Sequence, residues 1–125
     1  MLVKCINSFR QQISEGDVYI VIEVLVKRTK NIISYRVIDN EGFPAIYDSK
    51  NFEIISNNID DFAISVCQDK IVLSHKLILN SEVNEKNVEG FWGLFIEDDI
   101  ETREILKNVV CSMANIEGIE SPKIL

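Results

Sequence analysis

The residues best suited to covalent chemistry are Cys67 and the only histidine of the chain, His75. A thiol beside an imidazole base is the nucleophilic pair of many enzymes. The two residues fall in neighbouring apolar segments, FAISVC and IVLSH, which two adjacent strands could bring together. A lone histidine flanked by apolar residues is more often structural, so we rank this pair below the binding functions considered below.

Two carboxylate doublets, Asp60–Asp61 and Asp98–Asp99, could be read as acid and base pairs or as magnesium ligands. Adjacent side chains point to opposite faces of a strand and diverge by about 100° on a helix, so neither doublet is a ready-made site. Asp98, with Glu101 three residues later, instead fits a capping box at the start of a helix. Phosphate-binding glycine motifs and an H-E-x-x-H motif are absent. We therefore predict no catalytic residue, no cofactor and no metal site.

The charge of the chain favours some partners over others. It carries 13 basic and 20 acidic residues, a net charge of −7, and residues 37–125 hold 17 of the acidic groups. A negative surface repels nucleic acid and anionic lipid, so neither nucleic acid nor a membrane is an expected partner. The one basic cluster, VKRTKN at 26–31, falls where a strand ends and is interpreted as a solvated hairpin tip. A basic protein is the partner that the charge favours.

Three cysteines, Cys5, Cys67 and Cys111, have neither the number nor the spacing of a disulfide framework or a zinc site. We interpret them as buried free thiols in a reducing compartment. The segment MLVKCINSFRQQ lacks the apolar region of a signal peptide, and no apolar run approaches the ~20 residues of a membrane span. The expected location is the cytoplasm.

The pattern of residues 1–56 predicts five short antiparallel strands: LVKCIN, DVYIVIEVLVKR, NIISYRVID, FPAIYD and the end of SKNFEII. In the second of these, alternation places every other residue of 18–26 on one strongly buried face. The Asx and glycine residues of 39–42 predict a tight reversal, and Pro44 should begin a strand or lie on an edge. Five strands joined by turns indicate a small curled sheet or barrel.

The rest of the chain is expected to add strands and end in a helix. Residues 57–97 predict two further strands in FAISVCQDKIVLSHKLIL, with QDK as the turn, and an exposed loop in NSEVNEKNVEG. Apolar residues at helical spacing between Ile105 and Met113 predict a helix over 98–117 that Gly118 ends. The segment IESPKIL should be a loosely held tail. The expected fold is a single α+β domain over residues 1–125.

Several stretches resemble known bacterial proteins. ISEGDVYIVIEV with Gly16 and Tyr19, YRVIDNEG, and AIYDSKNFEII with Tyr47 and Phe52 resemble the strands of small SH3-like barrels. GFWGLFIEDDIETREILKNVV is similar to the end of bacterial proteins of this size, some of which are immunity proteins encoded beside polymorphic or contact-dependent toxins. The resemblance implies an SH3-like first half and a role in neutralising a cognate toxin.

An acidic protein without catalytic groups is compatible with that role, because toxins that are nucleases hold phosphates and are usually basic. We expect a non-enzymatic cytoplasmic protein that occludes the active surface of a toxin. Phe91 and Phe95 should lie in the core, whereas the sequence leaves Trp92 open between core and interface. The candidate partner-binding residues are Trp92, Glu97, Asp99, Asp60 and Asp61. The alternative is an SH3-like adaptor or regulatory module that binds a peptide or nucleic acid through its barrel face.

Overall fold

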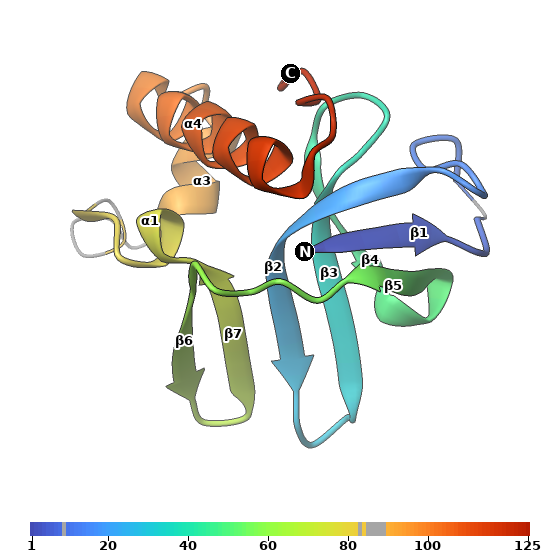
Figure 1. Ribbon diagram of the computed structural model, residues 1–125. Coiled ribbons are helices and arrows are strands. Elements are labelled where there is room, and N and C mark those ends of the chain that lie inside the picture. The colour runs from blue at the N-terminus through green and yellow to red at the C-terminus, as the bar shows by residue number, and fades with distance from the viewer. Residues whose placement is uncertain (9, 83, 85–89) are drawn as a thin grey trace.

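The computed structural model describes residues 1–8, 10–82, 84 and 90–125 (Figure 1). The strands are β1 (Leu2–Cys5), β2 (Val18–Lys27), β3 (Ile32–Ile38), β4 (Pro44–Asp48), β5 (Phe52–Ser56), β6 (Phe62–Cys67) and β7 (Lys70–His75). The helices are the short 3₁₀ turn η1 (Ser49–Asn51), α1 (Lys76–Leu79), α3 (Gly90–Ile96) and α4 (Ile100–Glu117). The predicted α+β class is confirmed, and the antiparallel sheet of the described residues is curled but not closed into a barrel.

The long strand β2 is the centre of the sheet. One of its edges pairs with β3, which in turn pairs with β4. Its other edge is shared: the first part, Val18 to Ile20, pairs with β1, and the later part, Glu23 to Lys27, pairs with β7. The sheet therefore forks, so that β1 and β5 leave β2 on one side and the β6–β7 hairpin extends away from the helices (Figure 1).

A β-bulge in β2 corrects the prediction that one face of this strand is buried along its whole length. The register with β3 shifts between Val21 and Glu23. Ile20 and Ile22 pack on the helix side of the sheet, whereas Val24 packs on the opposite side with Val21. An extra residue in one strand reverses the facing of every residue that follows, and sequence alternation alone cannot reveal it.

The two faces of the curled sheet each cover an apolar core. On the helix side, Phe91 and Phe95 from α3 and Leu106 from α4 pack on β2 and are at most 1 % exposed, as predicted for the two phenylalanines. Burial of each such side chain contributes about 1.5–3 kcal/mol. Inside the curl, the rings of Tyr19, Tyr35, Tyr47 and Phe52 pack around one another. The predicted five strands of residues 1–56 therefore enclose a core of their own.

Residues 57–97 contain helices that the sequence interpretation did not include. Strands β6 and β7 and the turn between them are as predicted, but α1 and α3 occupy segments that were expected to be strand or loop. The run GFWGLFI is short and apolar throughout, so its periodicity cannot separate a buried helix from a buried strand. Residues 83 and 85–89 of the expected NSEVNEKNVEG loop lie outside the described residues.

Helix α4 confirms the predicted C-terminal helix, but its N-cap is Asp99 rather than Asp98. The Asp99 carboxylate accepts a hydrogen bond from the backbone N–H of Thr102 at 2.9 Å. Asp98 has a positive φ of 63°, which places it outside the helix. Gly118, with φ 69°, ends the helix in the left-handed conformation as expected.

The last residues are held more firmly than the sequence predicted. The Leu125 N–H donates to the Gly42 carbonyl at 2.9 Å, and Ile124 packs against the helix-side core. The expectation of a loosely held tail is therefore wrong, because the Leu125 backbone is bonded to the β3–β4 turn and the Ile124 side chain contacts the core. Within the described part of the chain, none of the helices combines the length and apolar character needed to cross a membrane.

Candidate functional site

The turn between α3 and α4 carries the most exposed large apolar side chains of the described residues. Ile96 is 68 % exposed and Ile100 is 78 % exposed. Carboxylates surround them in the sequence and are exposed in the structure: Glu97, Asp98, Glu101 and Glu104. We call the two isoleucines and these four carboxylates the acidic turn. It combines exposed apolar side chains with exposed negative ones within nine consecutive residues.

The acidic turn is anchored to the core by the residues on either side of it. Phe95, one residue before Ile96, is buried, and the Arg103 guanidinium lies 4.5 Å from the centre of its ring. Arg103 also forms an ion pair with Asp98. The backbone of the turn is held by the N–H groups of Asp98 and Asp99, which donate to the carbonyl oxygens of Phe95 and Leu94 at 3.1 Å each.

Two of the predicted partner-binding residues belong to this turn, with different roles. Glu97 is exposed and available to a partner. Asp99 is half-buried and caps α4 through its hydrogen bond to Thr102, so its carboxylate already has a structural partner. The sequence interpretation assigned the cap to Asp98, and the structure exchanges the two roles: Asp98 is the exposed carboxylate.

Trp92 lies half-buried against the sheet, on a network that the sequence interpretation missed. Its indole N–H donates to Glu23 Oε2 at 3.2 Å, and the Arg36 guanidinium lies 4.2 Å from the centre of its ring. Arg36 Nε in turn donates to Glu23 Oε1 at 3.2 Å. Burial lowers the pKa of Arg36, and the Glu23 carboxylate acts in the opposite direction. Trp92 therefore holds α3 on the sheet rather than standing free on the surface.

Part of the Trp92 ring still borders open space. It lines a groove of about 650 Å³ between the sheet and the helices, together with Leu25, Val72 and Ile46 of the strands.

The sequence contained a signal for the buried pair of Glu23 and Arg36. Glu23 is the one charged residue within the apolar run YIVIEVLV, and a carboxylate at such a position requires a partner.

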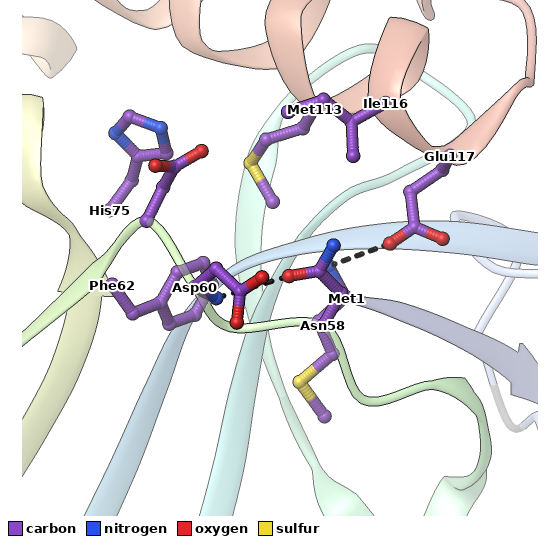
Figure 2. A pocket seen from close by; sticks show the side chains of 9 residues that line it. Met1, Asn58, Asp60, Phe62, His75, Met113, Ile116 and Glu117 are labelled. Carbon is purple, nitrogen blue, oxygen red and sulfur yellow. Dashed lines mark hydrogen bonds and ion pairs between the residues drawn. The ribbon is translucent and has the colours of Figure 1, made fainter.

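Asp60 and Asp61, the other predicted partner-binding residues, border a small cavity of about 250 Å³ (Figure 2). It lies between the β5–β6 connection, the end of β7 and the last turns of α4. Figure 2 shows Met113 and Ile116 of α4 on one side of it and His75 near one end. The remaining lining residues are Met1, Asn58, Phe62 and Glu117.

Polar contacts fix the rim of this cavity. The Met1 ammonium lies 3.6 Å from Glu117 Oε1, and Asp61 Oδ1 lies 3.4 Å from the Lys76 ammonium. The Asp60 N–H donates to Asn58 Oδ1 at 3.1 Å. The Asp61 carboxylate is therefore part of an ion pair, whereas Asp60 is exposed and takes part in the local turn through its backbone N–H.

His75 is buried and serves as the cap of α1. Its Nδ1 accepts a hydrogen bond from the Leu77 N–H at 3.2 Å, and the residue is 3 % exposed. Burial lowers the pKa of His75, and the nearby Asp61 carboxylate acts in the opposite direction. The neutral imidazole is the form that accepts the capping hydrogen bond.

The Cys67–His75 pair considered from the sequence does not form. In the β6–β7 hairpin Cys67 lies opposite Lys70 and His75 lies opposite Phe62. The thiol and the imidazole are therefore five residues apart along the hairpin, or about 17 Å. Among the described residues, no group of three or more histidines, cysteines or carboxylates is arranged to hold a metal ion.

The expectation of three buried thiols is correct only for Cys5. Cys67 and Cys111 are exposed. Cys67 ends β6, which is the outer strand of its hairpin, and Cys111 lies on the outward side of α4, so neither has a layer of structure above it.

The structure does not bring the predicted acidic residues into one surface. Glu97 precedes the first turn of α4, whereas Asp60 and Asp61 border the cavity beside Glu117 at its last turn. An α-helix of 18 residues is about 27 Å long, so the two acidic groups lie near opposite ends of the molecule's longest helix.

No protein-family model matches this sequence, and neither a characterised protein nor a solved structure is significantly similar to it.

Proposed function

We propose that this protein is an immunity protein that binds a cognate bacterial toxin and covers its active surface with the acidic turn. The observation that carries the proposal is the exposure of Ile96 and Ile100 in a segment that also holds four exposed carboxylates. Protein interfaces typically combine an apolar centre, which contributes most of the affinity, with a polar rim that excludes water. The acidic turn has this composition and is held in place by the core.

The charge of the acidic turn defines the kind of toxin surface that it fits. Asp98 is paired with Arg103, and the other three carboxylates leave the acidic turn negative, which is complementary to a basic surface such as a cleft that holds nucleic-acid phosphates. Opposite charges increase the rate of encounter, and this increase falls as salt screens the charges. Occlusion of a cleft needs no chemistry from the inhibitor.

The alternative function, an SH3-like adaptor, requires aromatic rings exposed on the barrel face. Grooves that bind proline-rich peptides are lined by such rings. Here Tyr19, Tyr35, Tyr47 and Phe52 are between 5 % and 8 % exposed and pack in the inner core. Trp92 does line a groove, but its ring is half-buried and held by Glu23 and Arg36. The immunity interpretation is therefore the better supported of the two.

The test is a binding experiment with the protein encoded by the neighbouring gene, purified with a tag and with its active site inactivated. We expect a complex at about 0.05 M salt that weakens at about 0.5 M salt. At the higher salt concentration the Debye length is shorter than the distances between the carboxylates of the acidic turn and the charged groups of the partner, so their attraction is screened. Absence of a complex at the lower salt concentration would refute the proposal.

Variants of the acidic turn locate the interface. Because Ile100 is exposed, Ile100→Ala should leave folding unchanged and weaken binding by about tenfold or more, as expected of a central apolar contact. Glu97→Lys should weaken the complex mainly by slowing association. The matched control is Glu120→Lys, which makes the same change of charge at an exposed position after α4. If Ile100→Ala and Glu97→Lys both bind like the unchanged protein, the acidic turn is not the interface.

A further inference from the structure

Strand β6 presents a free edge. In the described residues it pairs with β7 and with no other strand. In an antiparallel pair the backbone groups of alternate residues point to the neighbour, so the groups of the residues between them point outward. The register with β7 turns the backbone groups of Phe62, Ile64 and Val66 outward, and the Phe62 N–H already donates to the Ile59 carbonyl at 2.9 Å. The donors and acceptors open to another strand are therefore those of Ile64 and Val66.

This edge lacks the features that usually prevent strands from pairing between molecules. Proteins protect exposed edges with lysine, proline, bulges or a covering helix. The sequence of β6, FAISVC, has no charged residue and no proline, and its register with β7 is regular over all six residues. Ile64 is 61 % exposed and Val66 is 58 % exposed. The edge is therefore suited to accept another strand.

Apolar residues continue from β6 across one face of the sheet. Residues directly opposite one another in neighbouring strands share a face, and the pairing gives two cross-strand rows. One row contains Ile33, Val26, Ile71 and Val66, and the other contains Val24, Leu73 and Ile64. Each row ends at the free edge, so a strand added there would extend both.

The ends of β6 carry opposite charges. Asp60 and Asp61 precede the strand, and with Lys76 beside Asp61 this end has a net charge of −1. Near the other end of β6 lie three cations, Lys70 of β7, Lys27 opposite it on β2, and Arg28, which follows Lys27 in sequence. Together with the Asp69 carboxylate they give this end a net charge of +2. A strand that runs antiparallel to β6 and has the same charges would place each acidic end beside a basic one.

We propose that two copies of this chain associate by antiparallel pairing of β6 with β6. A two-fold axis at Ser65 would place Ile64 of one copy opposite Val66 of the other, twice, and would join the apolar rows of the two sheets. A second copy is the occupant that matches the edge in both respects, since it supplies the same apolar alternation and the complementary order of charges. The proposal is independent of the toxin.

A strand of six residues is about 20 Å long, so this interface is small beside the roughly 800 Å² per partner of standard stable complexes. We therefore expect a reversible dimer. Sedimentation velocity from about 1 µM to about 1 mM protein should show the mass rising from the chain mass of 14.3 kDa toward twice that value. A mass of one chain over the whole range would overturn the proposal.

Two lysine variants distinguish edge pairing from stacking of the apolar faces. Val66→Lys puts a charge on the free edge and should shift the midpoint of association by at least tenfold in concentration. Ile33→Lys is the matched control, because Ile33 is 42 % exposed and lies in the same row but on β3, away from the edge. If Ile33→Lys abolishes association as strongly as Val66→Lys does, the copies stack face to face and the proposed pairing is wrong.

Disulfide cross-linking tests the register. In a background with Cys67→Ser and Cys111→Ser, the variant Ser65→Cys should form a cross-linked dimer under mild oxidation, because residue 65 faces itself across the axis. The other pair predicted to face each other is Ala63 and Cys67, so Ala63→Cys with Cys67 retained should cross-link between copies, whereas Cys67 alone should not. Cross-linking of Cys67 alone, with none by Ser65→Cys, would refute the register.

Discussion

The network of Glu23, Arg36 and Trp92 gives the most direct test of how α3 is held on the sheet. Glu23 is 5 % exposed, and its two carboxylate oxygens accept from Trp92 and Arg36 at 3.2 Å each. Glu23→Gln keeps the shape of the side chain and an acceptor for the indole N–H, but removes the charge opposite Arg36. The substitution therefore isolates the ion pair from the packing.

The expected cost follows from the burial of the partner. The Arg36 side chain is 14 % exposed, so without Glu23 its charge remains largely away from water. Loss of one partner from a buried pair costs about 3–5 kcal/mol. Because Gln can still accept one hydrogen bond and Arg36 keeps a contact with the Pro44 carbonyl at 3.2 Å, we expect about 2–3 kcal/mol for Glu23→Gln.

The double variant makes the prediction sharper. Adding Arg36→Met removes the unpaired charge and leaves an apolar side chain of similar length beside the Trp92 ring. The Glu23→Gln/Arg36→Met protein should therefore be more stable than Glu23→Gln alone, with a coupling free energy of at least about 2 kcal/mol.

Urea unfolding followed by far-UV circular dichroism measures these free energies, and the single tryptophan, Trp92, reports on its own site by fluorescence. A cost below about 0.5 kcal/mol for Glu23→Gln would match an exposed ion pair and would refute the argument. Additive costs in the double variant would show that the two side chains do not interact.

Three further predictions concern the rest of the fold. Gly42→Ala should lower the free energy of unfolding, measured with urea, by about 2 kcal/mol or more, because the new Cβ would lie 2.2 Å from the Lys123 carbonyl oxygen. The control is Gly16→Ala, which is also at positive φ but has open space around it and should cost only about 1 kcal/mol. Burial lowers the pKa of His75 in the folded protein. The stability contributed by the neutral imidazole is therefore present above about pH 6.5 and is lost as the pH falls through the pKa of the folded protein. His75→Asn should make the free energy of unfolding depend less on pH in this range. Burial and the Asp39 carboxylate raise the pKa of Tyr47 to about 12, so its phenolate should appear in an ultraviolet titration only near that pH. The free energy of unfolding that this shift contributes should be present below about pH 10 and be lost as the pH rises above it. Tyr47→Phe should remove both the ultraviolet change near pH 12 and this loss of stability.

The sequence predicted those parts of the fold that depend on local patterns. The reversal at 39–42 follows from its side chains: the Asp39 carboxylate accepts from the N–H groups of Glu41 and Phe43, and Gly42 has a φ of 78°. Pro44 begins the edge strand β4, where a missing N–H costs nothing. Strand positions and turn chemistry are local properties, so a single sequence reveals them.

Features that depend on distant contacts could not be predicted in the same way. The bulge in β2 appears only in its pairing with β3, and α3 is helical because Phe91 and Phe95 meet the sheet and α4. At the cap of α4, Asp98 and Asp99 are both suitable residues, and the local motif did not distinguish them.

The candidate site was predicted in part. Glu97 was identified and is exposed, but Ile96 and Ile100, which give the acidic turn its apolar centre, were not proposed for binding. Their exposure depends on how the short helix α3 ends and α4 begins. Trp92, in contrast, was considered as an interface residue because tryptophan is enriched there, whereas its contacts are with Glu23 and Arg36.

The two proposed surfaces lie on different parts of the molecule, and this has a consequence for function. The acidic turn joins the two helices on one side of the sheet, whereas the free edge of β6 belongs to the hairpin that extends away from them (Figure 1). Pairing through β6 would leave both acidic turns uncovered, so a dimer could bind two toxin molecules. It follows that Val66→Lys should weaken self-association without weakening the toxin complex. Ile100→Ala should weaken the toxin complex and leave self-association unchanged. If either substitution impaired both properties, the two surfaces would not be independent.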